Sequence, residues 1–209
     1  QLQVTPTAPQ EVVRILCSRL ELSHRRVFAQ NSPLDLSFFY KLTSRMEADG
    51  HPELFYPAAR PMLPPPEYDL AAEVKKRDVL LSYPYQSIRP FITMLKKAAQ
   101  DPEVISIKMT LYRMARESQI VQALMEAAEN GKEVVALVEL RARFDEQNNI
   151  DWSKQLEEAG CTVIYGFDDY KVHSKLTLIT KKNQDGYAYI TQIGTGNYND
   201  CLLYTSDAA

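Results

Sequence analysis

Helical and strand-like patterns alternate regularly between residues 87 and 193, and this alternation limits the possible fold more than any other feature of the chain. Helices are predicted at residues 87–100, 119–130 and 149–159, and Gly131 and Gly160 follow the last two. Strands are predicted at residues 104–111, 134–140, 161–165, 176–182 and 187–193. The turn Asn183-Gln184-Asp185-Gly186 joins the last two strands. An α/β fold is predicted.

Some of these strands are almost continuously apolar, as in Val134-Val135-Ala136-Leu137-Val138. Such strands are typical of a sheet that is buried on both faces between helices, so we expect an α/β sandwich. In sheets of this class the functional residues lie just past the carboxyl ends of strands. Tyr112-Arg113 and Arg141-Ala142-Arg143 occupy that position.

The first part of the chain follows a different pattern. Helical spacing of apolar residues predicts a helix at residues 10–21 and a weaker one at about 34–45. Six prolines then fall within residues 52–66, where neither a helix nor a central strand can continue. We therefore expect a small, mostly helical segment at residues 1–60 and an α/β domain at residues 61–200.

Composition excludes several classes of protein. The net charge of −3 argues against a general nucleic-acid or anionic-membrane binder, and no apolar run approaches the roughly 20 residues that cross a bilayer. Three separated cysteines without a CxxC pair indicate neither a zinc site nor a disulfide framework. We expect a cytoplasmic protein. The first residues contain no initiator Met and no signal-peptide pattern, so we expect that the chain begins inside a longer protein.

Any polyanion must therefore be bound locally. Basic residues cluster at four places, although most such side chains are ordinarily solvated: Arg113 with Arg116, Arg141 with Arg143, Lys171 with His173 and Lys175, and Lys181 with Lys182.

His173 is the histidine whose position favours chemistry. His24 and His51 lie in predicted exposed loops, whereas His173 follows the turn-prone residues 166–169 and directly precedes a strand. Strand alternation would place His173 and Lys175 on the same face. A neutral imidazole is a competent nucleophile or general base near pH 7, and a nearby ammonium group can neutralise a phosphate oxygen.

A second short motif, Gly194-Thr195-Gly196-Asn197, follows the last predicted strand. Its glycines allow close backbone approach, and its hydroxyl and amide groups can donate to phosphate oxygens. The motif lacks the spacing and the lysine of a P-loop, and a simple tight turn is the alternative interpretation.

An HxK motif, a strand hairpin and a G-T-x-N motif in this order resemble one half-site of the phospholipase D superfamily, whose active sites pair two such halves around one phosphoryl group. That superfamily has an Asp a few residues after the Lys. Here Lys175 is followed by Leu176-Thr177-Leu178-Ile179-Thr180, which argues against a nuclease or phospholipase.

Longer strings resemble the polyphosphate kinase family of the large, multidomain type, with phospholipase-D-like catalytic domains. The resemblance covers residues 5–200 and lies in IKMTLYR (107–113), AAENGK (127–132), VELRARFDE (138–146), KVHSK (171–175) and IGTGNYN (193–199). It implies that residues 1–60 are the end of a head domain and that residues 61–200 are a truncated first catalytic domain.

The resemblance implies an enzyme that moves the terminal phosphate of ATP reversibly onto polyphosphate, through a phosphohistidine and with Mg²⁺. His173 matches the phosphorylated histidine, and Arg113 and Arg143 match arginines of the family's phosphate and magnesium site. A guanidinium has no lone pair to donate, so we interpret both as phosphate clamps near the metal and not as ligands. Lys175 is expected to assist catalysis, and Lys171 and residues 194–197 to bind phosphate. ADP is the other nucleotide, and a homo-oligomer is expected for the full-length protein.

Residues 201–209 depart from the family pattern and resemble a translated sequencing adapter, so we expect this tail to be non-native. The nucleotide-binding domain and the second catalytic domain are expected outside the chain, which should then show no steady-state synthesis alone. Two alternatives stay open: a phospholipase-D-like phosphodiesterase half-site, or a non-catalytic domain that binds polyphosphate or nucleotide.

Overall fold

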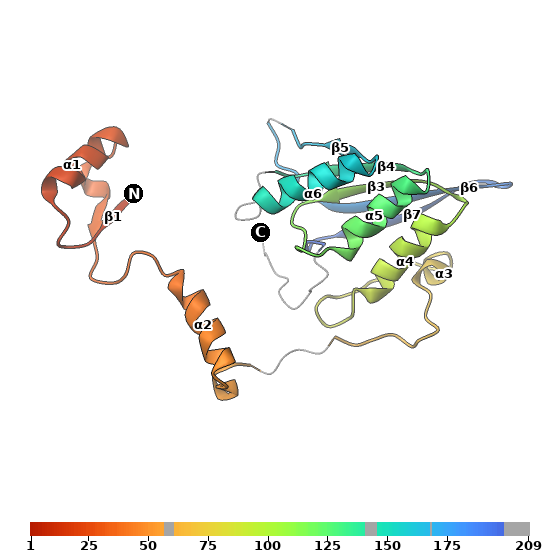
Figure 1. The fold of residues 1–209 in the computed structure, drawn as a ribbon, viewed down its shortest axis with the longest axis horizontal. Coiled ribbons are helices and arrows are strands. Elements are labelled where there is room, and N and C mark those ends of the chain that lie inside the picture. The colour runs from red at the N-terminus through yellow and green to blue at the C-terminus, as the bar shows by residue number, and fades with distance from the viewer. Residues whose placement is uncertain (57–60, 141–145, 168, 199–209) are drawn as a thin grey trace. The chain divides into compact units, whose positions relative to one another are not determined.

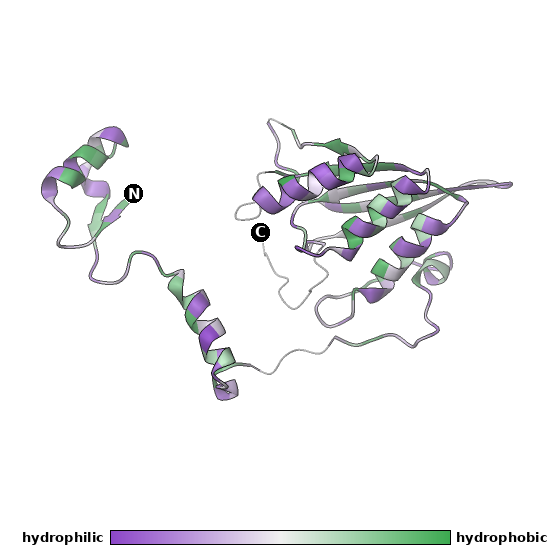
Figure 2. Cartoon of the chain, in the orientation of Figure 1, coloured by the Kyte–Doolittle hydropathy of each residue, from purple (hydrophilic) through white to green (hydrophobic). Residues whose placement is uncertain are grey.

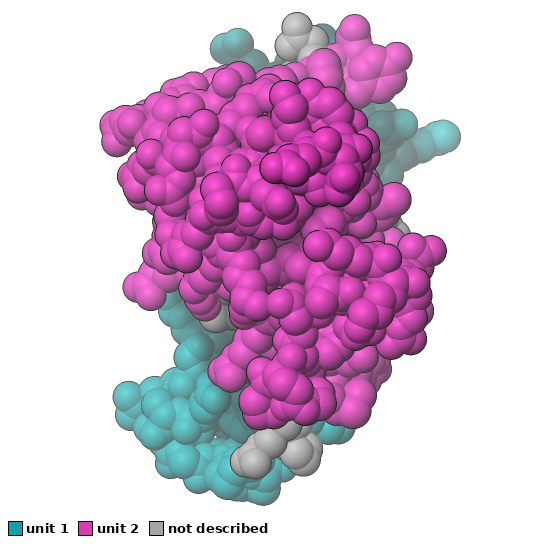
Figure 3. Space-filling model, turned by 90° about the vertical axis from the view of Figure 1, so that its right-hand side faces the viewer, with its two compact units in different colours: residues 1–58 teal, residues 59–209 magenta. Residues whose placement is uncertain are grey.

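A computed structural model of the chain describes residues 1–56, 61–140, 146–167 and 169–198 (Figure 1). The chain divides into two compact units, residues 1–58 and 59–209 (Figure 3). Among the described residues, no helix is both long and apolar enough to cross a membrane. The predicted phosphate clamp Arg143 and the predicted non-native tail lie outside the described residues.

The first unit is mostly helical. Helices α1 (Gln10–Arg19) and α2 (Phe38–Ala48) correspond to the two predicted helices, and short 3-10 turns occupy His24–Arg26 and Pro52–Leu54. Strands β1 (Leu2–Val4) and β2 (Val27–Ala29) pair in parallel, which no sequence pattern predicted. Three-residue strands are too short to show an alternating period.

The second unit is built on a five-stranded mixed sheet in the order β5-β4-β3-β6-β7. Its strands are β3 (Val104–Leu111), β4 (Glu133–Val138), β5 (Thr162–Ile164), β6 (Lys175–Asn183) and β7 (Gly186–Gly194). Strands β3, β4 and β5 are parallel, whereas β6 runs antiparallel to β3 and β7 antiparallel to β6. The mixed sheet with its helices confirms the predicted α/β fold.

Four helices accompany this sheet: α3 (Leu70–Val74), α4 (Arg89–Gln100), α5 (Gln119–Glu129) and α6 (Glu146–Glu158). Ser118 caps the start of α5, because its Oγ accepts a hydrogen bond from the N–H of Val121 at 3.3 Å. Gly131 and Gly160 follow α5 and α6 with φ of +78° and +91°, a left-handed conformation that favours glycine. Helices α5 and α6 therefore end just before Gly131 and Gly160, as the sequence predicted.

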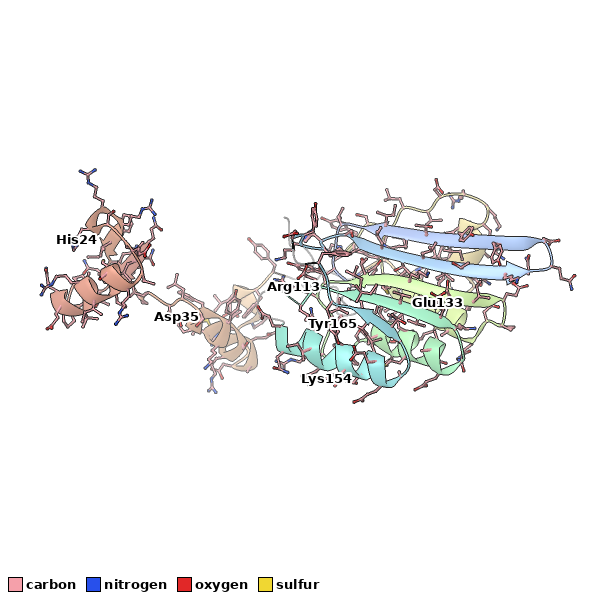
Figure 4. All side chains as sticks on the ribbon, turned by 90° about the horizontal axis from the view of Figure 1, so that it is seen from above. His24, Asp35, Arg113, Glu133, Lys154 and Tyr165 are labelled. Atoms are coloured by element: carbon pink, nitrogen blue, oxygen red, sulfur yellow. The ribbon has the colours of Figure 1, made fainter. Side chains whose placement is uncertain are left out.

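Helices α4, α5 and α6 cover one face of the sheet (Figure 4), and hydrophobic and hydrophilic residues alternate along each of them (Figure 2). Beneath them lies the core, which includes Ile107, Met109 and Leu111 of β3 and Val134, Ala136 and Val138 of β4. On the other face of the sheet, side chains of β6 and β7 such as Leu176, Tyr189 and Ile193 are exposed. The prediction of burial on both faces is therefore wrong for the described residues, because the helices lie on one side only.

The strand directions bring several strand ends together at one edge of the sheet. Since β6 is antiparallel to β3, its first residue, Lys175, lies near the carboxyl end of β3. Since β7 is antiparallel to β6, its last residue, Gly194, pairs with Lys175. We call this edge, formed by the ends of β3, β4 and β7 and the start of β6, the site edge. Figure 4 shows Arg113 at this end of the strands and Glu133, the first residue of β4, toward the other.

Candidate functional site

His173 and Lys175 meet at the ring of Tyr112. The exposed His173 ring forms a T-shaped contact with the Tyr112 ring, with centroids 5.1 Å apart and planes at 74°. Lys175 Nζ lies 4.8 Å from the centroid of the same ring and donates a hydrogen bond to the carbonyl oxygen of His173 at 2.7 Å. The structure therefore brings together the two side chains that the HxK motif predicted to share a face.

Lys175 is the largest of the fully buried side chains, with 1% of its surface exposed. Burial, and secondly the charge of Arg113, lower the pKa of its ammonium group. In the described part of the chain no carboxylate lies within ion-pair distance of Nζ. A buried cation without an anion is costly, so this position favours the binding of an anionic ligand.

Two further cations lie beside the same ring. Lys171 Nζ is 5.4 Å from the Tyr112 centroid, and the guanidinium carbon of Arg113 is 5.9 Å from it. Burial lowers the pKa of His173, and the charges of Lys175 and Lys171 lower it further. The neutral imidazole, which has a free lone pair, is therefore favoured near pH 7.

The predicted phosphate loop, residues 194–197, begins directly beside Lys175. A Cβ atom on Gly194 would lie 2.8 Å from Nε2 of the flexible Gln192 side chain, which would have to shift, and at an ordinary contact distance of 3.7 Å from Lys175 Cβ. A Cβ atom on Gly196 would meet nothing within 4 Å. Oδ1 of Asn197 is buried and has no hydrogen-bond donor among the described residues. An unsatisfied buried acceptor is typical of a site that a ligand or water completes.

Tyr198 fixes the far end of this loop. Its hydroxyl group hydrogen-bonds to Thr177 Oγ1 at 2.8 Å and donates to Gln192 Oε1, and its ring stacks on Phe91 with centroids 5.6 Å apart. Since Gly194 is held in the ladder opposite Lys175, the loop is fixed at both ends. Tyr198 was not predicted to belong to the site, although it directly follows the G-T-G-N motif.

Glu139 and Asn149 support the site from behind, and neither was predicted. Glu139 is 4% exposed, and its Oε2 accepts a hydrogen bond from the N–H of Val172 at 2.9 Å. Asn149 is fully buried, and its Nδ2 donates to the carbonyl oxygens of Tyr112 at 2.7 Å and Glu139 at 3.0 Å. The amide of Asn149 thus ties the end of β3 to the end of β4.

The segment before β6 is also held by Thr110. Its Oγ1 accepts a hydrogen bond from the N–H of Leu176 at 2.8 Å and donates to the carbonyl oxygen of Ser174 at 2.6 Å. An open depression of about 660 Å³ lies here, lined by Thr110, Leu137, Phe167 and residues 170–174. His173 and Lys171 therefore line this depression, whereas Lys175, Arg113 and residues 194–197 are not among its lining residues.

Other predicted residues lie elsewhere. Lys181 is at the opposite end of β6, where it forms an ion pair with Asp101, and Lys182 lies 5.7 Å from the ring of Tyr187. Among the described residues, no group of three or more His, Cys, Asp or Glu side chains could hold a metal ion. Arg113 cannot act as a ligand, because a guanidinium has no lone pair to donate.

Comparisons with known proteins agree on one family. Residues 69–206, more than half of the chain, match the family described as Polyphosphate kinase C-terminal domain 1. The chain is 44% identical over 202 residues to a polyphosphate kinase of Halalkalibacterium halodurans, covering 93% of this chain and 28% of that relative. It is 40% identical over 210 residues to a polyphosphate kinase of Pseudomonas aeruginosa, covering 98% of this chain and 30% of that one.

A solved structure gives the same result. The crystal structure of polyphosphate kinase from Porphyromonas gingivalis superposes with a TM-score of 0.65 at 28% sequence identity, over 87% of this chain and 27% of that chain. The chain thus spans less than a third of the length of the relatives it matches. From the matched domain, the two relatives and the shared fold we conclude that the chain belongs to the polyphosphate kinase family.

Proposed function

We propose that this chain supplies the phosphohistidine half of a polyphosphate kinase active site, with His173 as the residue that carries the phosphoryl group. The substrates would be ATP and polyphosphate in one direction, and ADP and polyphosphate in the other. The observation that carries the proposal is the buried Lys175, which has no carboxylate among the described residues and lies beside the exposed His173.

The reaction has two balanced steps. In the first, the lone pair of a His173 ring nitrogen attacks the γ-phosphorus of ATP, a P–N bond forms, and the bond from that phosphorus to the β,γ-bridging oxygen breaks to release ADP. In the second, a terminal oxygen of polyphosphate attacks the same phosphorus, a P–O bond forms, and the P–N bond breaks. The imidazole is regenerated, and the reverse sequence makes ATP.

The cations of the site edge suit this chemistry. Phosphoryl transfer depends mainly on positioning and on neutralising charge at the phosphate oxygens. Lys175, Lys171 and Arg113 all lie within 6 Å of the centroid of the Tyr112 ring, which the His173 ring contacts, so their charges are available near a phosphoryl group on His173. Loop 194–197 borders the same position, since Gly194 pairs with Lys175. Lys175 is then a catalytic residue, and the other groups bind phosphate.

We propose that Mg²⁺ enters the site bound to the phosphates of the nucleotide. Mg²⁺ is commonly bound by substrate phosphates together with one or two carboxylates and water. The described residues contain no cluster of acidic side chains that fits the ion, and residues 141–145 with Arg143 lie outside them. We therefore assign Mg²⁺ no ligand on this chain and no step of the reaction. Cytoplasmic location and assembly of the full-length protein into an oligomer remain predictions.

The test is labelling of a full-length polyphosphate kinase that contains this sequence. Incubation with γ-labelled ATP should give a label that is stable to base and lost in acid. His173→Gln should abolish the label, and His51→Gln, which changes an exposed histidine of the first unit, should keep it. Acid-labile label on the His173→Gln protein would refute the assignment.

A further inference from the structure

We infer that Tyr112 is a positioning residue, whose aromatic ring holds Lys175 and Lys171 beside His173 without neutralising their charge. The inference rests on the proposed function and gives a specific role to Tyr112, for which the sequence predicted only a position just past the end of a strand.

The ring of Tyr112 is the common neighbour of the reactive groups. The His173 ring contacts it, and Lys175 Nζ, Lys171 Nζ and the Arg113 guanidinium all lie within 6 Å of its centroid. Tyr112 itself is buried, with 8% of its surface exposed. No other described aromatic ring has more than one cation beside it.

A closed set of contacts fixes the ring relative to the histidine. The carbonyl oxygen of Tyr112 accepts from Asn149 Nδ2, which also donates to the carbonyl oxygen of Glu139. The carboxylate of Glu139 in turn accepts from the N–H of Val172, the residue before His173. The backbone segments that carry the ring and the imidazole are therefore tied to the same buried pair, Asn149 and Glu139.

An aromatic ring can reduce the repulsion between the cations without forming an ion pair with them, which a carboxylate cannot do. Cations gathered at one place repel one another, and the negative face of an aromatic ring offsets part of this repulsion. A carboxylate would offset more of it, but it would form ion pairs with the lysines and compete with the incoming phosphate oxygens. With Tyr112 at this position, Lys175 is held against the ring without being paired to a carboxylate among the described residues.

The contacts involve the ring and not the hydroxyl group, so the two can be separated by mutation. In a full-length enzyme, Tyr112→Phe should phosphorylate His173 within about 3-fold of the wild-type rate in a single turnover. Tyr112→Leu should be slower by about 10²-fold, because small displacements of reacting groups have effects of that size. Tyr187→Leu is the matched control: it removes a ring beside Lys182, away from the site edge, and should leave the rate unchanged.

A second readout is independent of activity. The chain has three histidines, so the ring protons of His173 can be assigned by NMR in the 209-residue protein. The T-shaped contact predicts a ring-current shift that Tyr112→Phe keeps and Tyr112→Leu loses, with Tyr112→Met, which is unbranched at Cγ, replacing the Leu variant if that one does not fold. Thermal unfolding shows whether each variant is folded.

The outcomes separate the two proposals. A folded Leu or Met variant that labels at the wild-type rate would overturn the role of Tyr112, as would a Phe variant as slow as these. Absence of the ring-current shift in the wild type would also overturn it. If the wild-type enzyme shows the shift but never labels His173, the contact stands and the proposed function is wrong.

Discussion

Strand β6 carries a largely buried lysine at each end, and the two lysines have opposite surroundings. Lys175 and Lys181 are six residues apart, so their side chains point to the same face of the sheet. Lys181 forms an ion pair and hydrogen bond with Asp101. Lys175 contacts a carbonyl oxygen and the ring of Tyr112, and no described carboxylate lies within ion-pair distance.

Under the proposed function, this difference distinguishes Lys181, which stabilises the fold, from Lys175, which binds the phosphate. At the far end, burial tends to raise the pKa of Asp101, but the hydrogen bond from Lys181 and the charges of Lys181 and Lys132 lower it. Lys132 Nζ also donates to the carbonyl oxygens of Asp101 and Val104. Lys181 is thus paired with a carboxylate, whereas Lys175 has no carboxylate within ion-pair distance in the part of the chain that the structure describes.

The largest effect is expected for Lys175→Met. Removing a charged group that contacts the transferring phosphoryl lowers turnover by about 10²–10³-fold. Because the substitution also removes a buried charge, the free energy of unfolding should fall by no more than about 1 kcal/mol. Turnover of the full-length enzyme and thermal unfolding measure the two quantities. A variant that unfolds but keeps its activity per folded molecule would make Lys175 a structural residue like Lys181.

Arg113→Ala should lower turnover by about 10²-fold, because Arg113 belongs to the same positive cluster. Arg143→Ala is expected to behave in the same way, as its predicted role is the same, although it lies outside the described residues. Steady-state kinetics of full-length variants, corrected for the folded fraction, provide the measurement. The exposed Arg116→Ala is the control and should change turnover by less than about 3-fold. If all three variants lost turnover equally, Arg113 and Arg143 could not be distinguished from an ordinary surface arginine such as Arg116.

Lys181→Met tests the other end of the strand. It should lower the free energy of unfolding by about 1–3 kcal/mol and leave turnover per folded molecule unchanged. Fully buried pairs have larger effects, but the side chains of Lys181 and Asp101 remain 17% and 26% exposed.

The effect of Lys181→Met should also depend on pH. The pKa of Asp101 is lowered from its ordinary 3.8, so the pair stabilises the fold above that pH and the stabilisation is lost as the pH falls below it. Denaturant unfolding of both proteins at pH 7 and near pH 3 should therefore show a smaller difference at the lower pH. An equal difference at both values would contradict the ion pair as its cause.

The smallest expected effect is a shift in the pKa of His173. Its pKa is lowered from the ordinary 6.5, so its NMR midpoint should lie below 6.5, and Lys175→Met should move it upward. The folded chain binds this proton more weakly than the unfolded chain, so the histidine contributes more to stability as the pH rises, and fully above 6.5. A midpoint above 6.5 would show that a negative group outweighs both the burial of His173 and the charges of the two lysines.

Much of the second unit was predictable because its signals are local. β3 begins and ends at the predicted residues, and Gly131 and Gly160 end helices as expected. The open sheet face was not predictable, because an apolar run such as Val134–Val138 reads the same whether one face or both faces are covered. Only the arrangement of helices α4, α5 and α6 decides between the two.

The site residues also divide into those that a local sequence pattern predicted and those that depend on contacts between distant parts of the chain. His173 and Lys175 were identified because a short motif joins them, and the structure places them at one ring. Glu139 and Asn149 were missed, because their role depends on contacts across 33 and 37 residues of sequence. A buried glutamate at the end of an apolar strand is nevertheless a feature that sequence reasoning could have used, since charged residues are seldom buried without a partner.

The most direct test of the account is a chase of the isolated phosphoenzyme. Full-length enzyme labelled from γ-labelled ATP is freed of nucleotide and divided between excess polyphosphate and excess ADP. We expect the label to leave His173 and to appear in longer polyphosphate in one portion and in ATP in the other. Label that stays on the protein, or that is released only as inorganic phosphate, would contradict the claim that the positive edge around His173 transfers a phosphoryl group between the two substrates.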